Sequence, residues 1–204
     1  MSLEAAEPAP PSHDALALLE IDAVATGLRC VDTMVKRAEV EILEANLVEP
    51  GRFLILFAGG VADVDESWDA ALEFAGSAAV GRMKLAFVHP AVLAGLRGVE
   101  HRGTADELDT LGVIEGTGIA SVLEACDRAL KDAGVNLVGL RIAGGLGGRA
   151  FFVVSGAQHD VEAAIDVGGS ILDSHGQRHR TELIARPHAE LVPWLLRPSP
   201  FQVR

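Results

Sequence analysis

The chain of 204 residues contains one sequence twice, and this internal repeat limits the possible folds more than any other feature. The segment that begins near residue 15 matches the segment that begins near residue 111. At an offset of 95, the matched pairs are Glu20 with Glu115, Leu28 with Leu123, Asp32 with Asp127, and Lys36 with Lys131. Beyond an intervening loop the offset becomes 97, and the pairs are Gly51 with Gly148, Arg52 with Arg149, Gly59 with Gly156, Val64 with Val161, and Pro90 with Pro187. A chance match would not keep its register over so much chain, so the sequence predicts two copies of one module.

The extent of the repeat sets the expected domain boundaries. Matched residues cover 15–96 and 110–196, and the stretch between them, RGVEHRGTADELD, is polar. Each copy has a length that suits a small domain. We therefore expect a flexible, Pro-rich extension over 1–14, a first module over 15–97, a linker over 98–109 and a second module over 110–204.

Both copies begin with the same two predicted elements. A short apolar strand over Leu16–Ile21 or Leu111–Glu115 is followed by a helix. Apolar residues in this helix are spaced by four, three and four, which places them on one face. They are Val24, Leu28, Val31 and Val35 in the first copy, and Ile119, Leu123, Cys126 and Leu130 in the second. The i,i+4 pairs of opposite charge, expected on exposed helix faces, are Asp32 with Lys36 and Asp127 with Lys131.

The rest of each copy predicts two strands joined by a turn, a second helix, and a final strand that ends at a Pro turn. The predicted strands are Val40–Ala45, Phe53–Phe57 and Lys84–Val88 in the first copy, and Asn136–Ile142, Ala150–Val154 and Glu182–Ala185 in the second. The predicted second helices are Asp63–Ala75 and Asp160–Val167. The predicted fold class is therefore α/β of the α+β kind, with two tandem ferredoxin-like β-α-β-β-α-β modules.

The composition argues against several kinds of partner. The net charge is −12 and the pI is near 4.9, whereas nucleic acids and anionic membranes attract clustered Lys and Arg. No apolar run approaches the roughly 20 residues that span a bilayer. The acidic start, MSLEAAEPAPPSHD, lacks the basic and apolar regions of a signal peptide. We expect a cytoplasmic protein that binds neither nucleic acid nor membrane.

Histidine and cysteine provide few candidates for metal binding or catalysis. His175 and His179 are four residues apart, but the surrounding DSHGQRHR contains Gly and many polar residues and is typical of a surface loop. No third ligand has a matching spacing. Cys30 and Cys126 both fall in predicted helices, without a CxxC or Cys–His spacing, so they are expected to be small core residues.

Other polar motifs also have a structural interpretation. GGLGG at 144–148 lacks the Lys-Ser/Thr of a phosphate loop and lies between two strands, so a flexible turn is favoured. Asp63, Asp65 and Glu66 lie at the start of a helix, where acidic side chains meet the helix dipole favourably. Trp68 and Trp194 are expected to pack in the core or at an interface. We therefore predict no enzyme, no metal site and no bound cofactor.

The order of these motifs resembles the bacterial microcompartment shell domain in both copies. The first copy matches through LLEIDAVATGLRCVDTMVKRAEVEIL and GRFLILFAGGVADVDESWDAA, and the second through IEGTGIASVLEACDRALKDAGVNLV, GRAFFVVSGAQHDVEAAIDVG and IARPH. The second copy keeps the family's Arg-Pro-His as Arg186-Pro187-His188, while the first has His89-Pro90-Ala91. The element order matches the family without circular permutation.

The resemblance implies a structural tile rather than a catalyst. Three chains of two modules would form a homotrimer that mimics the family's hexamers, with a central pore for small metabolites. Implied partners are other microcompartment shell proteins, both hexameric and pentameric tiles. Some tandem relatives carry an iron–sulfur cluster on pore-loop cysteines, but neither loop here contains Cys, so the resemblance implies no cluster in this chain.

The resemblance also implies roles for particular residues. The pore-lining residues would be Val48, Glu49, Pro50 and Gly51 in the first copy, and Leu146, Gly147 and Gly148 in the second. The tile-edge residues would be Lys36, Lys131 and Arg186. Glu49 would either form a ring of negative charge in the pore or lie on the surface, and Arg52 and Arg149, which follow the loops, would offset such a charge.

A second function remains open on the sequence alone. Ferredoxin-like folds host many activities. The alternative is a regulatory protein that binds a small ligand at the glycine-rich loop over 144–148.

Overall fold

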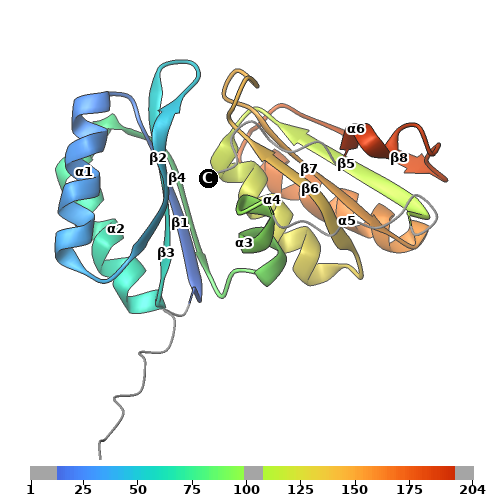
Figure 1. The fold of residues 1–204 in the computed structure, drawn as a ribbon, viewed down its shortest axis with the longest axis horizontal. Coiled ribbons are helices and arrows are strands. Elements are labelled where there is room, and N and C mark those ends of the chain that lie inside the picture. Colours follow the sequence, from blue (N-terminus) through green and yellow to red (C-terminus); the bar gives the residue numbers. More distant parts are fainter. Residues whose placement is uncertain (1–12, 99–107, 196–204) are drawn as a thin grey trace, which may run out of the picture.

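The computed structural model describes residues 13–98 and 108–195 (Figure 1). Most of the expected extension over 1–14, most of the expected linker over 98–109, and the C-terminal residues 196–204 lie outside this described part. The two repeat copies are therefore described almost completely.

The first copy contains the predicted order of elements. They are β1 (Ala15–Ile21), α1 (Val24–Arg37), β2 (Glu41–Val48), β3 (Arg52–Gly59), α2 (Val61–Ala75), a 3-10 turn (Gly76–Ala78), β4 (Ala79–Ala86) and α3 (Pro90–Leu96). The second copy repeats them as β5 (Thr110–Gly116), α4 (Ile119–Asp132), β6 (Asn136–Ile142), β7 (Ala150–Gly156), α5 (Gln158–Ser174), β8 (His179–Ala185) and α6 (Val192–Leu195). The short helices α3 and α6 were not predicted from the sequence. In α3, Pro90 occupies the first helical position and His89 caps it, which is a favourable helix start.

Each copy forms one four-stranded antiparallel sheet, which confirms the predicted fold class. The strand orders are β2-β3-β1-β4 and β6-β7-β5-β8. Both sheets carry an irregularity at matching positions, between Ile42 and Glu44 in β2 and between Leu137 and Gly139 in β6. The duplication is thus preserved down to a local break in the strand register.

The two modules are stacked so that α4 lies between the two sheets (Figure 1). Helices α1 and α2 cover one face of the first sheet, and α4 of the second module covers the other. The apolar run in β3 is accordingly buried on both faces. One continuous core therefore joins the modules within the chain.

In the last strand, the structure matches the residues of the two copies differently from the sequence repeat. Ala15 lies opposite Ala86 in the first sheet, and Thr110 lies opposite Ala185 in the second. The structural offset is therefore 99 in this strand, and the sequence match of Pro90 with Pro187 is wrong. The shift arises because α5 runs two residues further than α2 before the chain turns back.

The corrected register also aligns the turns that follow the last strands. Phe87 and Arg186 share a positive φ, 54° and 50° respectively. Two residues later, the ring Nδ1 atoms of His89 and His188 each accept a hydrogen bond from a backbone N–H two residues on. The family's Arg-Pro-His in the second copy therefore corresponds to Phe87-Val88-His89 in the first.

The apolar helix face has a different environment in each copy. In α4 the four predicted residues Ile119, Leu123, Cys126 and Leu130 are all buried. In α1, by contrast, Val24, Leu28 and Val35 are 41%, 58% and 48% exposed. The side of α1 that packs on its own sheet is the one carrying Gly27, Cys30 and Met34. An apolar stripe on α1 is therefore left uncovered in the single chain.

Candidate functional site

The first candidate pore loop is a tight connection between β2 and β3. Glu49, Pro50 and Gly51 are exposed, and the Glu49–Pro50 peptide is cis. Gly51 has a φ of +91° and donates its N–H to the carbonyl of Val48 at 3.0 Å. Val48 itself is buried in the core at 5% exposure, so it supports the loop from beneath and is not on its surface.

The second candidate loop, 143–149, is longer and rich in positive φ angles. Ala143, Gly144, Gly145, Gly147 and Gly148 all have φ above +20°. The N–H of residue 146 donates to the carbonyl of residue 143 at 3.0 Å, and the N–H of residue 149 donates to the carbonyl of residue 146 at 3.2 Å. Glycine is required here for backbone conformation, which favours the turn over a phosphate loop.

The two loops touch each other within the chain. The Glu49 carboxylate accepts a hydrogen bond of 2.7 Å from the backbone N–H of Gly147. A Cβ at Gly148 would lie only 2.7 Å from the carbonyl oxygen of Glu49. Only a glycine at Gly148 permits this close approach of the two backbones.

The arginines that follow the loops form ion pairs with residues other than Glu49. Arg52 donates to the buried carboxylate of Glu20 at 2.7 Å, and Arg149 donates to Glu115 at 3.1 Å. Both glutamates belong to the central strand next to the loop. These arginines therefore do not directly offset the charge of Glu49.

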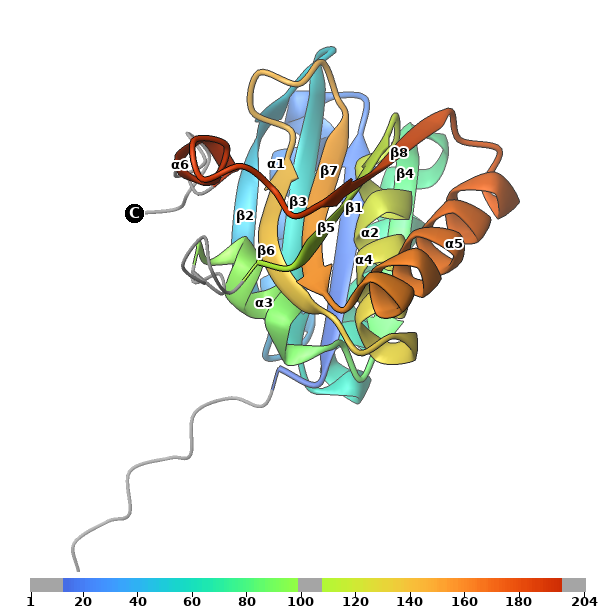
Figure 2. The same cartoon turned by 90° about the vertical axis from the view of Figure 1, so that its right-hand side faces the viewer.

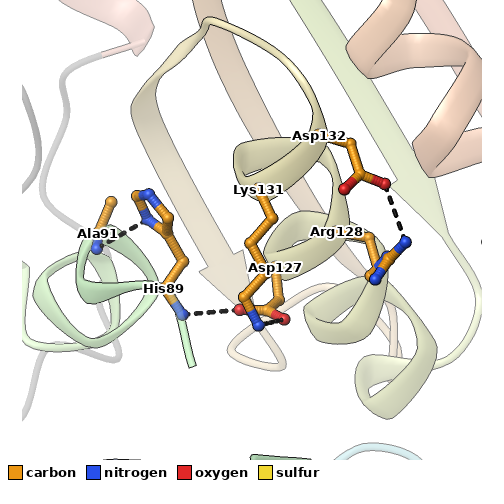
Figure 3. A network of polar contacts seen from close by, with 6 residues as sticks. All are labelled: His89, Ala91, Asp127, Arg128, Lys131 and Asp132. Atoms are coloured by element: carbon orange, nitrogen blue, oxygen red, sulfur yellow. Dashed lines mark hydrogen bonds and ion pairs between the residues drawn. The ribbon is translucent and has the colours of Figure 1, made fainter. Parts of the chain in front are cut away.

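A polar contact between the modules lies in the C-terminal half of α4 (Figure 3). The buried carboxylate of Asp127 accepts a hydrogen bond of 2.7 Å from the backbone N–H of His89 in the first module. The same carboxylate binds Lys131 at 2.6 Å. The expectation that the Asp127–Lys131 pair is exposed is therefore wrong for Asp127, which is buried between the modules, whereas Lys131 remains exposed.

The matching pair on α1 is exposed. Asp32 and Lys36 form an ion pair of 2.7 Å, with side chains 45% and 71% exposed. The hydrogen bond from Lys36 lowers the pKa of Asp32 below its usual value. One matched pair of residues thus joins two modules in the second copy and faces solvent in the first.

Arg186, the third candidate tile-edge residue, is exposed at the end of β8. Its backbone N–H donates to the carbonyl of Asp109 at 2.8 Å. Its positive φ turns the chain away from the sheet.

The structure separates the two histidines that the sequence placed four residues apart. His175 follows α5 and contacts Glu124 at 2.9 Å, whereas His179 begins β8 and lies 3.6 Å from Asp173. No group of three metal-ligating side chains occurs within residues 13–98 and 108–195.

The remaining candidates occupy structural positions. Cys30 and Cys126 are unbridged and buried on α1 and α4, and burial raises the pKa of both thiols. The acidic residues of α2 form surface ion pairs, Asp65 with Lys84 and Glu66 with Arg37. Trp68 lies near the Lys84 ammonium, and Trp194 is exposed. In the described part of the chain, no helix is both long and apolar enough to cross a membrane.

One feature of the second module was missed by the sequence analysis. A polar cleft of about 670 Å³ lies where β5 ends and β7 and β8 begin. Three consecutive basic residues, Arg178, His179 and Arg180, line it. The signal was available in the sequence, but the wrong offset in the last strand hid the contrast with the uncharged residues of the first copy.

Comparison with known proteins identifies the module. The model of the BMC domain family matches residues 15–92 and again 110–187. The bacterial microcompartment shell protein PduT of Citrobacter freundii is 30% identical over 177 residues, which cover 87% of this chain and 95% of PduT. The shell protein EutM of Salmonella typhimurium is 34% identical over 84 residues, covering 41% of this chain and 85% of EutM.

Solved structures agree with this match. The crystal structure of a microcompartment protein from Desulfitobacterium hafniense DCB superposes with a TM-score of 0.79 and 32% identity, covering 87% of this chain and 97% of the other. PduT and EutM are shell proteins, which bears out the expectation of a structural protein in place of an enzyme. The chain belongs to the BMC-domain family of bacterial microcompartment shell proteins, in the form that carries two such domains in tandem.

Proposed function

We propose that this shell protein forms a trimeric tile in which six modules surround a central pore for small metabolites. The observation that carries the proposal is the contact between the two modules within the chain. This contact joins two different surfaces, a sheet face and a helix face, and each module has both of them. One copy of each surface therefore has no partner module: the α1 stripe is exposed, and the face of the second sheet is covered only by the C-terminal segment.

The contact within the chain pairs a sheet face with a helix face. On the first sheet it buries an apolar surface that faces the second module, made of Leu16, Leu18, Leu54, Leu56, Met83 and Leu85. Against it lies α4, with the four buried apolar residues of its outer stripe. Burial of this much apolar surface is the main source of stability for such a contact.

The unpaired helix face is the exposed stripe of α1. Val24, Leu28 and Val35 occupy the positions of Ile119, Leu123 and Leu130 on α4. A row of large apolar side chains in water is typical of an interface that lacks its partner.

The unpaired sheet face belongs to the second module. Its residues occupy the positions of the buried face of the first sheet, and most remain apolar: Leu111, Val113, Phe151, Val153 and Ile184. A neighbouring copy would cover this face with its α1, as α4 covers the first sheet. A contact between two different surfaces repeats head to tail and closes into a ring when the rotation permits.

The polar contact beside α4 has the same unpaired counterpart. Asp127 binds the N–H of His89, and the residues at the matching positions are Asp32 and His188. In the proposed ring, Asp32 of one copy accepts from the N–H of His188 in the next. Asp32 is exposed in the single chain and forms an ion pair with Lys36, as Asp127 does with Lys131. Both features fit this role.

Ring closure requires the C-terminal segment to move. Leu191, Val192 and Leu195 pack on the outer face of the second sheet, and Figure 2 shows the chain crossing that face on its way to α6. The matching helix α3 does not return to its own sheet but packs on β6 of the second module, where a Cβ on Gly95 would lie 2.8 Å from Leu137. We infer that the segment transfers in the same way, from its own sheet to β2 of the neighbouring copy.

The two kinds of loop would alternate around the pore. The first carries Glu49, Pro50 and Gly51, and the second carries Leu146, Gly147 and Gly148. The bond from Gly147 to Glu49 turns this carboxylate toward the next loop along the ring. Lys36, Lys131 and Arg186 would contact neighbouring hexameric and pentameric tiles. Of the two lysines, Lys36 is the more exposed, at 71% against 30% for Lys131, and is the better suited to that contact.

Native mass spectrometry of the full chain tests the proposal. A chain of 21.4 kDa should give a trimer of about three times that mass. A monomer or dimer at micromolar concentration would overturn the trimer. The alternative, a ligand-binding regulator, would instead show a melting temperature that rises with a small ligand, and no observation in the loop over 144–148 favours it.

A further inference from the structure

The polar cleft of the second module lies beside the second pore loop. Arg149, the last residue of that loop, lines it together with Arg178, His179 and Arg180 from the start of β8. The cleft has a volume of about 670 Å³, which is within the range of small-molecule sites. Its position places any bound molecule next to the loop that carries Gly147 and Gly148.

In the cleft, two arginine side chains lack an ion-pair partner among the described residues, whereas both carboxylates have one. Arg149 is paired with Glu115 at 3.1 Å, and His179 lies 3.6 Å from Asp173. The guanidinium groups of Arg178 and Arg180 make no hydrogen bond or ion pair with any described residue. Two full positive charges therefore remain available in a chain whose net charge is −12.

Neutral donors lie in the same cleft. The hydroxyl of Thr117 donates to Oε1 of Gln177 at 2.8 Å. This bond fixes the orientation of the Gln177 side chain and leaves its amide N–H groups free to donate. Donors without competing acceptors are what an anion with several oxygens requires.

The first module has no such cleft chemistry. By the sheet register, Gly81 stands at the position of Arg180 and Ala79 at the position of His179, with Val80 in the irregularity between them. A Cβ on Gly81 would lie 2.7 Å from Oε1 of Glu20, so the buried Glu20 fills this space and pairs with Arg52. Within residues 13–98, the matching position therefore holds Gly81 and Glu20 in place of the cationic groups of the cleft.

The contact between the two modules also shows what would surround Arg180 in the proposed ring. Gly81 precedes Met83 and Leu85 on the strand face that is buried against α4, and Arg180 holds the matching position on β8. If a neighbouring copy covers β8 in the same way, Arg180 loses water on one side. A guanidinium that leaves water without an anion is strongly disfavoured.

We propose that this cleft binds a small multivalent anion whose oxygens belong to two or more carboxylate or phosphate groups. Arg178 and Arg180 each donate charge-assisted hydrogen bonds to one anionic group, and Gln177 donates to a second. All of these residues come from one chain, so binding does not require the trimer. In the assembled tile the bound anion would lie at the boundary between copies, beside the pore loop.

Isothermal titration calorimetry of the full chain tests this site with two probes, citrate and pyrophosphate, at fixed ionic strength. We expect one anion per chain, and the preferred probe distinguishes carboxylate from phosphate recognition. The double variant Arg178→Gln with Arg180→Gln should lower the affinity by about tenfold or more, because two charge-assisted contacts are lost. Melting curves of each variant check that the fold is retained.

A matched double variant controls for net charge. Arg82→Gln with Arg128→Gln removes the same two charges from surfaces outside the cleft, and we expect it to keep the wild-type affinity. An equal loss in both double variants would overturn the site and reveal general electrostatic attraction. The site would also be overturned if neither citrate nor pyrophosphate bound at millimolar concentration. The oligomeric mass of the same samples separates this result from a failure of the proposed trimer.

Discussion

Glu49 of the first module accepts a hydrogen bond of 2.7 Å from the backbone N–H of Gly147 in the second, 98 residues away along the chain. The bond joins the two loops that differ most between the copies. One is short and contains Pro50, and the other is long and built from glycines. The proposed tile-edge lysines, Lys36 and Lys131, are repeated in both modules, whereas the residues that join the loops are not.

Removal of this bond should loosen the second loop. We expect Glu49→Ala to raise the hydrogen-exchange rate of the Gly147 amide, because that N–H loses its acceptor. Glu49→Gln keeps an acceptor oxygen and should retain most of the protection. Amide exchange measured by NMR would check this, and equal exchange rates in wild type and Glu49→Ala would contradict the bond.

The glycines of the second loop should differ in their tolerance of a side chain. Gly147 has a φ of +61° and open space around its missing Cβ, so Gly147→Ala should cost about 1 kcal/mol through backbone strain alone. Gly148 has a φ of +78° and also lies against the carbonyl of Glu49, so Gly148→Ala should cost about 2–3 kcal/mol. Urea unfolding of both variants measures the difference, and equal costs would show that the loops do not touch.

The exposed stripe of α1 should be needed for assembly but not for folding. Leu28→Asp places a charge where the neighbouring sheet would pack, and the side chain is exposed in the single chain. We expect a folded monomer of 21.4 kDa. Phe74→Asp, on the exposed side of α2, is the matched control and should stay trimeric. A Leu28→Asp protein that remains trimeric would remove α1 from the interface.

The two matched aspartates should differ in their effect on folding. In the Leu28→Asp background, where no trimer complicates the reading, Asp127→Ala should cost about 2–4 kcal/mol. The loss leaves the His89 N–H and the Lys131 ammonium without their acceptor. Asp32→Ala in the same background should change the unfolding free energy very little, because its ion pair is exposed. Urea unfolding tests the contrast, and similar costs for both would contradict it.

The sequence predicted the element order, the fold class and most strand positions because periodicity and turn residues are local signals. It failed at the last strand, where two additional residues in α5 shift the register of β8. The helical spacing located the apolar stripe on α1, but spacing alone does not say whether a face is covered by the same chain or by another.

The contacts of the candidate site were the least predictable. Glu49 and Gly147 come together only because the modules stack with both loops at one end, which no local pattern encodes. The burial of Asp127 has the same origin, since its twin Asp32 has an equivalent sequence environment and remains exposed. Similar residues acquire different roles according to what the neighbouring module supplies.

Cysteine cross-linking across the proposed contact tests the closed ring most directly. A chain carrying Asp32→Cys and His188→Cys, treated with a short bismaleimide, should link head to tail, and the pair Asp127→Cys with His89→Cys is the internal control within one chain. We predict covalent products that stop at three chains, because the ring is then complete. No products larger than one chain, or a ladder that continues beyond three, would contradict the trimeric tile.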